Sequence, residues 1–230
     1  MSIVTPDTIL YNTIEGILKK IPENFNQYSD KSKTILYKLT NGVNLGDYDF
    51  YEQAKEVFFK DKGARRAIDL RVGWDQTRTQ LPTIYINMPS EDKGPEDGLG
   101  VDEGVDTFFD TNEKIYKNIY QRSFMSRYSV VITSNIRNEV VMIYYILKSM
   151  LIPLIDHLEM SGLKNPKLSG KDLGMGDGNL VPKTIMLRTL NIDFYYNQSV
   201  EDIFDYNYIK DFSFEGDAYL DNSFNKLDNS

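Results

Sequence analysis

The stretch RYSVVITSNIRNEVVMIYYILKSMLIPLIDHLEMSGL, residues 127–163, carries the strongest structural pattern of the chain. Its first part alternates apolar and polar residues, which predicts a strand over Ser126–Thr133. Ser134 and Asn135 follow as candidate N-caps, because their short polar side chains can accept backbone N–H groups at the start of a helix. A strand that leads directly into a helix predicts a sheet with this helix packed on it.

The rest of the stretch has the spacing of one long amphipathic helix, expected over Asn138–Ser161. Pro153 lacks an N–H and its ring clashes with the carbonyl four residues back, so we expect a kink or a break there. Gly162 is placed to end the helix in a left-handed conformation. The apolar residues expected to face the core are Val140, Ile143, Tyr144, Leu147, Met150, Leu151, Leu154, Ile155 and Leu158.

Two more strands are predicted, one before this stretch and one after it. Leu81–Met88 places Ile84, Ile86 and Met88 on one face, and Pro89 is expected to end it. Thr184–Tyr196 alternates in the same way and predicts a long closing strand. The residues between the long helix and this strand are rich in Gly and Lys and are interpreted as a loop.

An amphipathic helix is predicted near the start of the chain, over Pro6–Lys20. Thr5 is its candidate N-cap, and Pro22 is expected to stop it. Residues 24–80 are less regular and are interpreted as an insertion or embellishment. The elements predicted within them are a strand over Thr34–Thr40, a helix over Tyr51–Lys60 with Ala54, Val57 and Phe58 inward, and a strand over Ala67–Trp74.

These patterns predict an α+β fold. We expect a mixed, largely antiparallel sheet packed by the N-terminal helix and the long central helix, with long loops. Residues 1–196 are expected to form a single domain, residues 90–113 an acidic loop within it, and residues 197–230 a C-terminal arm.

Charge is unevenly distributed along the chain, whose net charge is −8. Residues 90–113 hold nine acidic residues and one lysine, and residues 200–230 hold eight acidic residues and two lysines, so the remainder is basic. One reading is that the acidic segments keep the surface solvated; the other is that they lie on the basic body of a neighbouring subunit. The candidate interface residues in the acidic loop are Glu96, Asp97, Asp102 and Glu103. Those in the basic cluster between Lys60 and Arg78 are Arg65, Arg66 and Arg71. For the basic cluster, the alternatives are contact with DNA phosphates and a solvated face.

The C-terminal arm carries more aromatic residues than a solvated tail does. We expect it to pack either on its own body or on an adjacent subunit. Its candidate interface residues are Tyr206, Tyr208, Phe212, Phe214 and Tyr219.

The order of the predicted elements resembles that of the tail-terminator and neck (head-to-tail connector) ring proteins of tailed bacteriophages. The resemblance covers the first helix and residues 81–197, through LPTIYINMPSE (81–91), RYSVVITSN (127–135), EVVMIYYILKSMLIPLIDHLEMSGL (139–163) and RTLNIDFYYN (188–197). The abundance of Asn, Tyr, Ile, Lys and Asp is in addition compatible with a crAss-like short-tailed phage.

This resemblance implies a structural virion protein that has no catalytic residues. It implies a cyclic homo-oligomer, twelve- or six-fold, in the neck or tail of the virion, assembled in the host cytoplasm. The implied partners are the portal or other neck and tail ring proteins, together with genomic DNA that passes through the lumen without specific binding. An acidic wall is compatible with such a channel, because it does not hold the phosphate backbone.

Enzyme chemistry is weakly represented in the sequence, and we expect no enzymatic activity, cofactor or metal. The absence of cysteine excludes thiolate metal sites and thiol nucleophiles. Leu173–Asn179 is rich in glycine but does not follow a strand of a βαβ unit, and His157 has no evident partners. The alternatives are a metal-dependent acidic enzyme and a non-viral protein-binding module.

No membrane segment is expected either. The most apolar stretch, Val140–Ile155, contains Lys148 and is shorter than a bilayer span. Met1–Asp7 lacks the basic start and apolar run of a signal peptide.

Overall fold

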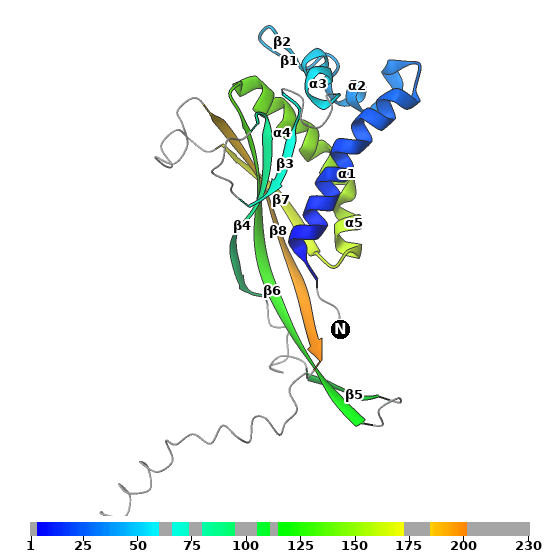
Figure 1. The fold of residues 1–230 in the computed structure, drawn as a ribbon, viewed down its shortest axis with the longest axis vertical. Helices are drawn as coiled ribbons and strands as arrows, with labels where there is room; N and C mark the ends of the chain where they lie inside the picture. The colour runs from blue at the N-terminus through cyan, green and yellow to red at the C-terminus, as the bar shows by residue number, and fades with distance from the viewer. Residues whose placement is uncertain are drawn as a thin grey trace, which may run out of the picture.

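The computed structural model describes residues 4–59, 66–73, 80–94, 105–110, 115–172 and 185–201, with the backbone alone for 105–110, 115–121, 172 and 200–201. It has an α+β fold in which helices cover one face of a six-stranded sheet (Figure 1). The strands of this sheet are β3 (Asp69–Val72), β4 (Thr83–Lys93), β5 (Val105–Asp110), β6 (Ile115–Ser134), β7 (Lys164–Asp172) and β8 (Met186–Glu201). The helices are α1 (Pro6–Gln27), α2 (Ile35–Thr40), α3 (Phe50–Phe58), α4 (Arg137–Leu151) and α5 (Ile155–Met160), with short 3₁₀ turns η1 (Lys31–Lys33) and η2 (Ile152–Leu154) and a small hairpin of β1 (Asn44–Leu45) and β2 (Tyr48–Asp49).

The sheet is mixed and largely antiparallel, as predicted. Its order is β3-β4-β6-β8-β7, and only β3 and β4 are parallel among the described pairs. The two longest strands, β6 and β8, lie side by side from Ser134 opposite Met186 to Ile119 opposite Glu201. Strand β5 pairs with the start of β6, so β4 and β5 occupy successive stretches of the same edge of that strand.

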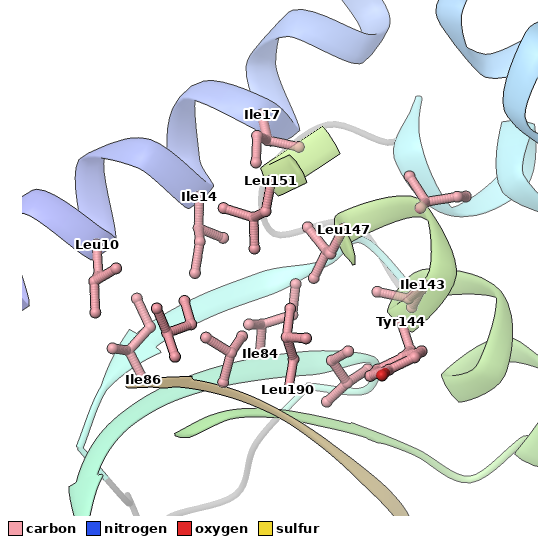
Figure 2. Packing of buried hydrophobic residues seen from close by; sticks show 14 of the residues in the cluster. Leu10, Ile14, Ile17, Ile84, Ile86, Ile143, Tyr144, Leu147, Leu151 and Leu190 are labelled. Carbon is pink, nitrogen blue, oxygen red and sulfur yellow. The ribbon is translucent and has the colours of Figure 1, made fainter. Parts of the chain in front are cut away.

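The core lies between this sheet and α1 and α4. In Figure 2, Leu10, Ile14 and Ile17 of α1 face Leu147 and Leu151 of α4 above the apolar face of the sheet. The sheet residues of this layer alternate along their strands, as a half-buried sheet requires. They include Ile84, Ile86, Tyr128, Val130, Ile132, Leu190, Ile192 and Phe194, each 1% exposed or less.

The long helix follows its sequence signals closely. A 3₁₀ turn at Ile152–Leu154 contains Pro153 and separates α4 from α5, which is the expected break. Gly162 has φ +100° and its N–H reaches the carbonyl of Glu159 at 3.0 Å, which ends α5 as predicted. The predicted N-caps were wrong, because the helix begins after Ile136, which makes no side-chain cap hydrogen bond. Ser134 instead accepts the N–H of Ile136 through its hydroxyl at 3.1 Å, in the turn before the helix.

By length and composition, the 24 residues of Arg137–Met160 could cross a membrane. The expectation that the apolar stretch around Val140–Ile155 is too short to cross a bilayer was therefore wrong, because the helical region that contains it is longer. Its apolar character has a different use here, because the face that carries Ile143, Leu147 and Leu151 is fully buried against the sheet and α1.

Two predictions in the N-terminal part were wrong. Thr34–Thr40 was expected to be a strand, but Thr34 caps a helix by accepting the N–H of Tyr37 through its hydroxyl at 3.3 Å. Seven residues are too few to distinguish the two periodicities. Helix α1 also passes through Pro22 to Gln27, since Ile21 is buried and the Asn24 side chain accepts the N–H of Ile35 at 2.7 Å.

The section expected to be an embellishment contributes to the same core. The predicted helix at Tyr51–Lys60 is present as α3, with Ala54, Val57 and Phe58 buried. Leu36 of α2 joins them at 1% exposed. The predicted strand at Ala67–Trp74 is present as the shorter β3.

Four strands lie wholly or partly in regions expected to be loop or arm. Pro89 does not end β4, because the register with β6 shifts between Asn87 and Ser90, and such an irregularity tolerates a proline. Strand β4 thus continues to Lys93 and β5 lies at Val105–Asp110, both within the expected acidic loop 90–113. The expected Gly- and Lys-rich loop contains β7, and β8 runs to Glu201, five residues into the expected arm.

Candidate functional site

Beyond the helices, the sheet continues as a narrow projection (Figure 1). We call it the ribbon: β5, residues 115–127 of β6 and residues 193–201 of β8. Strand β6 begins thirteen residues before Tyr128, whose hydroxyl bonds Asp7 of α1, and this separation corresponds to about 43 Å of strand. The base of the ribbon joins the core through Phe194 and Tyr196. Its outer part offers surface to other molecules and, among the described residues, strand edges without a partner strand.

The base of the ribbon is fixed on its helical side by two carboxylates. Asp7 in the first turn of α1 accepts the hydroxyl of Tyr128 at 3.0 Å. Glu91 of β4 accepts the hydroxyls of Tyr196 at 2.6 Å and of Ser126 at 3.0 Å. These five residues, which we call the junction, connect α1, β4, β6 and β8 at the point where the helical layer ends.

Burial and these bonds determine how the junction tyrosines titrate. Burial, then the hydrogen bond to Asp7, raises the pKa of Tyr128 far above its usual range. Burial, then the hydrogen bond to Glu91, raises the pKa of Tyr196 likewise. Both phenols therefore stay protonated and act as donors at any physiological pH.

Aromatic rings extend from the core into the ribbon. Tyr128 stacks on Phe194 with ring centroids 5.5 Å apart and planes 16° apart. One step further out, Phe124 stacks on Tyr196 at 5.5 Å and 26°. Such cross-strand pairs stabilise a sheet beyond the area that they bury, so the helical side of the ribbon base is rigid.

The opposite face of the ribbon base is polar. Arg127 donates to Asp193 across the two strands through Nε at 2.8 Å and through a terminal nitrogen at 3.2 Å. Close by, Ser129 donates to the side-chain oxygen of Asn191 at 2.9 Å. The bidentate contact fixes the geometry of β6 and β8 on the face that none of the described helices covers.

Within the basic cluster predicted as an interface, the two arginines that the structure describes make ion pairs inside the subunit. Arg66 donates to Glu139 at 2.8 Å, and its other terminal nitrogen lies 3.6 Å from Glu56. Arg71 pairs with Asp69 at 2.6 Å within β3. Arg65 lies outside the described residues. Arg66 thus holds the chain leading into β3 to α3 and α4, a role that the sequence did not indicate.

The other predicted interface residues are not among those that the structure describes. They are Glu96, Asp97, Asp102 and Glu103 of the acidic loop and Tyr206, Tyr208, Phe212, Phe214 and Tyr219 of the arm.

A cavity of about 360 Å³ lies beside edge strand β3, and sequence analysis did not foresee it. We call it the edge cavity. Its walls come from α1, α3 and the chain leading into β3, and its rim is charged. The lining residues are Tyr11, Glu15, Leu18, Lys19, Pro22, Glu23, Val57, Phe58, Ala67, Ile68 and Leu70. The available signal was that Leu18 and Pro22 are apolar yet lie off the stripe of α1 that faces the core.

Candidate chemical groups are scattered in the described part of the chain. There, no three His, Asp or Glu side chains gather in a way that could hold a metal ion. His157 is exposed on α5, and the glycine-rich segment 173–179 lies outside the described residues. What the described residues bring together is therefore a rigid projection with a fixed base and an apolar cavity at a sheet edge. No protein-family model matches the chain, and no curated protein matches its sequence.

Proposed function

We propose that this chain is a structural subunit of a ring in the neck or tail of a tailed bacteriophage, which joins the portal or head to the tail and lets DNA pass. The observation that supports it best is the ribbon, which projects beyond the helical layer and is braced at its base by the junction. A subunit that works alone gains little from strands that extend beyond its core, whereas an assembly gains a contact surface.

Other properties support the same proposal. The order of the main elements resembles that of such ring proteins, and the fold has a mixed sheet with helices on one face, which is compatible with that resemblance. The net charge of −8 suits a wall along which DNA slides without being held. The arm supplies a second means of contact between subunits, since its aromatic side chains are costly to leave in water.

The test is the assembly state of the purified full chain. We expect mass photometry to give a single large species, and negative-stain electron microscopy to give closed rings of twelve or six subunits with a central channel. Locating the chain in a virion neck or tail by cryo-electron microscopy would complete the test. A protein that remains monomeric up to high micromolar concentration would overturn the proposal and favour a binding module.

A further inference from the structure

We infer that the segment Asp202–Lys210 of one subunit pairs as an added strand with the free edge of β3 in a neighbouring subunit, and that its aromatic rings enter that subunit's edge cavity. The inference rests on the proposed function in one respect, because it requires a neighbouring copy. It assigns the aromatic arm a particular receptor site.

Strand β3 has an edge able to accept another strand. The Asp69 N–H bonds the Pro82 carbonyl at 3.1 Å, and the Gly73 N–H bonds the Ile86 carbonyl at 2.9 Å, so odd-numbered residues face β4. Leu70 and Val72 therefore direct their backbone N–H and C=O groups away from β4. Among the described residues β3 pairs with β4 alone, and the Val72 side chain is 52% exposed.

The edge cavity lies directly beside this edge. Ile68 and Leu70 form part of its wall, so a strand added to β3 would run along its mouth. Its volume of about 360 Å³ is within the range of cavities that hold ligands. In strand addition, backbone bonds supply affinity and pockets for alternate side chains supply specificity.

The sequence after β8 has the matching pattern. Phe204, Tyr206 and Tyr208 occupy every second position, with Asp205 and Asn207 between them. In an extended strand these three rings share one face and the polar residues share the other. The apolar face fits the cavity, and the charged rim of Glu15, Lys19 and Glu23 provides partners for tyrosine hydroxyls.

Chain length determines that the receptor is a different copy. Across the sheet, Val72 of β3 is at the level of Leu190 of β8, through the pairs Val72–Ile86, Ile86–Val130 and Val130–Leu190. Leu190 is eleven residues before Glu201, the last residue of β8. That separation is about 36 Å along β8. Tyr208 is seven residues beyond Glu201 and reaches at most about 25 Å, so the three rings cannot return to their own cavity.

Cysteine pairing tests this directly, because the chain has no cysteine of its own. Lys19 lines the cavity and its side chain is 64% exposed, so Lys19→Cys is compatible with folding. One chain carries Lys19→Cys, and a second chain with a different tag carries Phe204→Cys, Tyr206→Cys or Tyr208→Cys. The two chains are co-expressed. After oxidation we expect at least one of the three pairs to give a reducible heterodimer on a non-reducing gel.

A matched control uses Ser169→Cys on the exposed edge strand β7, which should give no heterodimer with the same three arm variants. Heterodimer at β7 in place of β3, or no heterodimer with either, overturns the inference. Mass photometry of the same preparations distinguishes this inference from the proposed ring function. If rings form but no disulfide to Lys19→Cys does, only the inference about β3 is overturned. If no rings form, both the inference and the proposed function are overturned.

A second measurement does not depend on cysteine geometry. Tyr206→Ser/Tyr208→Ser should raise the protein concentration needed for assembly by on the order of tenfold or more. Asp205→Ser/Asn207→Ser, on the other face of the strand, should change it little. Equal effects of the two double variants would overturn the inference.

Discussion

Arg66 donates a hydrogen bond of 2.8 Å to Glu139, a residue 73 positions later whose side chain is 1% exposed. Ser134 donates to the other carboxylate oxygen. Arg66 itself has φ +70°, in the left-handed region that favours glycine. A buried carboxylate and an arginine in an uncommon backbone conformation thus fix the start of α4 to the edge of the sheet.

Removing Arg66 should therefore be costly. Arg66→Ala leaves Glu139 buried without its counter-charge, and we expect a loss of about 3 kcal/mol in the free energy of unfolding, measured in urea. Lys55→Ala, which removes an exposed pair with Glu52, should cost less than about 1 kcal/mol. Similar losses in the two variants would show that the buried pair has no special weight.

Two glycines should respond oppositely to alanine. A Cβ at Gly170 on β7 would collide with the Tyr144 side chain, which is held beneath the Arg188 guanidinium 4.3 Å from its ring. We expect Gly170→Ala to lower the melting temperature. Gly16 in α1 has open space around it, so Gly16→Ala should stabilise by about 0.5–1 kcal/mol. A neutral Gly170→Ala would mean that Tyr144 can move aside.

The buried face of α4 should not tolerate charge. Leu147 and Leu151 are 0% exposed, and Leu147→Asp or Leu151→Asp should abolish folding at a cost of several kcal/mol. Ile152, next in sequence to Leu151, is 54% exposed, and Ile152→Asp should leave a cooperative transition by circular dichroism. A folded Leu147→Asp variant would contradict the packing shown in Figure 2.

Tyr48 should make stability depend on pH at the alkaline end. Burial, then the charge of Glu139, raises the pKa of Tyr48 to about 12, against about 10 when unfolded. Its contribution is therefore complete below pH 10 and is lost as the pH rises toward 12. In Tyr48→Phe we expect this loss to be smaller by on the order of 1–2 kcal/mol.

At pH 7 the same substitution should be nearly neutral. The Tyr48 hydroxyl is buried and makes no hydrogen bond to any described residue, so removing it leaves no partner unsatisfied. Urea denaturation at pH 7, 10 and 11 checks both statements. A parallel pH dependence in the parent and the variant would assign the alkaline loss to other groups.

Truncation should separate folding from assembly. Ser199 and Glu201 pair with β6, so the chain is cut after Glu201 in order to keep β8 whole. We expect the shortened protein to keep its melting temperature and to form no rings by mass photometry. If it unfolds, the arm completes the core; if it assembles normally, the arm is only a solvated tail.

Local periodicity was sufficient to predict the central elements. The stretch around α4 has enough residues for a helical pattern to be unmistakable, and Pro153 and Gly162 act through their own covalent geometry. Thr34–Thr40 was misassigned because seven residues fit both periods. Pro22 was misjudged because burial of Ile21 outweighs one missing hydrogen bond, and this depends on packing that sequence does not show.

The functional surfaces were harder to foresee. Arg66 was correctly noted as part of a basic cluster, yet its partner Glu139 is distant in sequence and nothing local links the two. The ribbon was missed because β5, the start of β6 and the end of β8 lie outside the segments with a clear strand pattern, and there strand pairing overrides the local preference. The edge cavity arises from three separate segments, and its one local signal is that Leu18 and Pro22 are apolar yet lie off the stripe of α1 that faces the core.

The length of β6 also has a mechanical consequence. A force applied to the tip of the ribbon along this strand loads it in shear, because all sixteen residue pairs with β8 must slide together. A force applied across the strands would instead peel the pairs apart one after another from Glu201. The subunit should therefore resist tension along the ribbon more strongly than a force that separates β6 from β8.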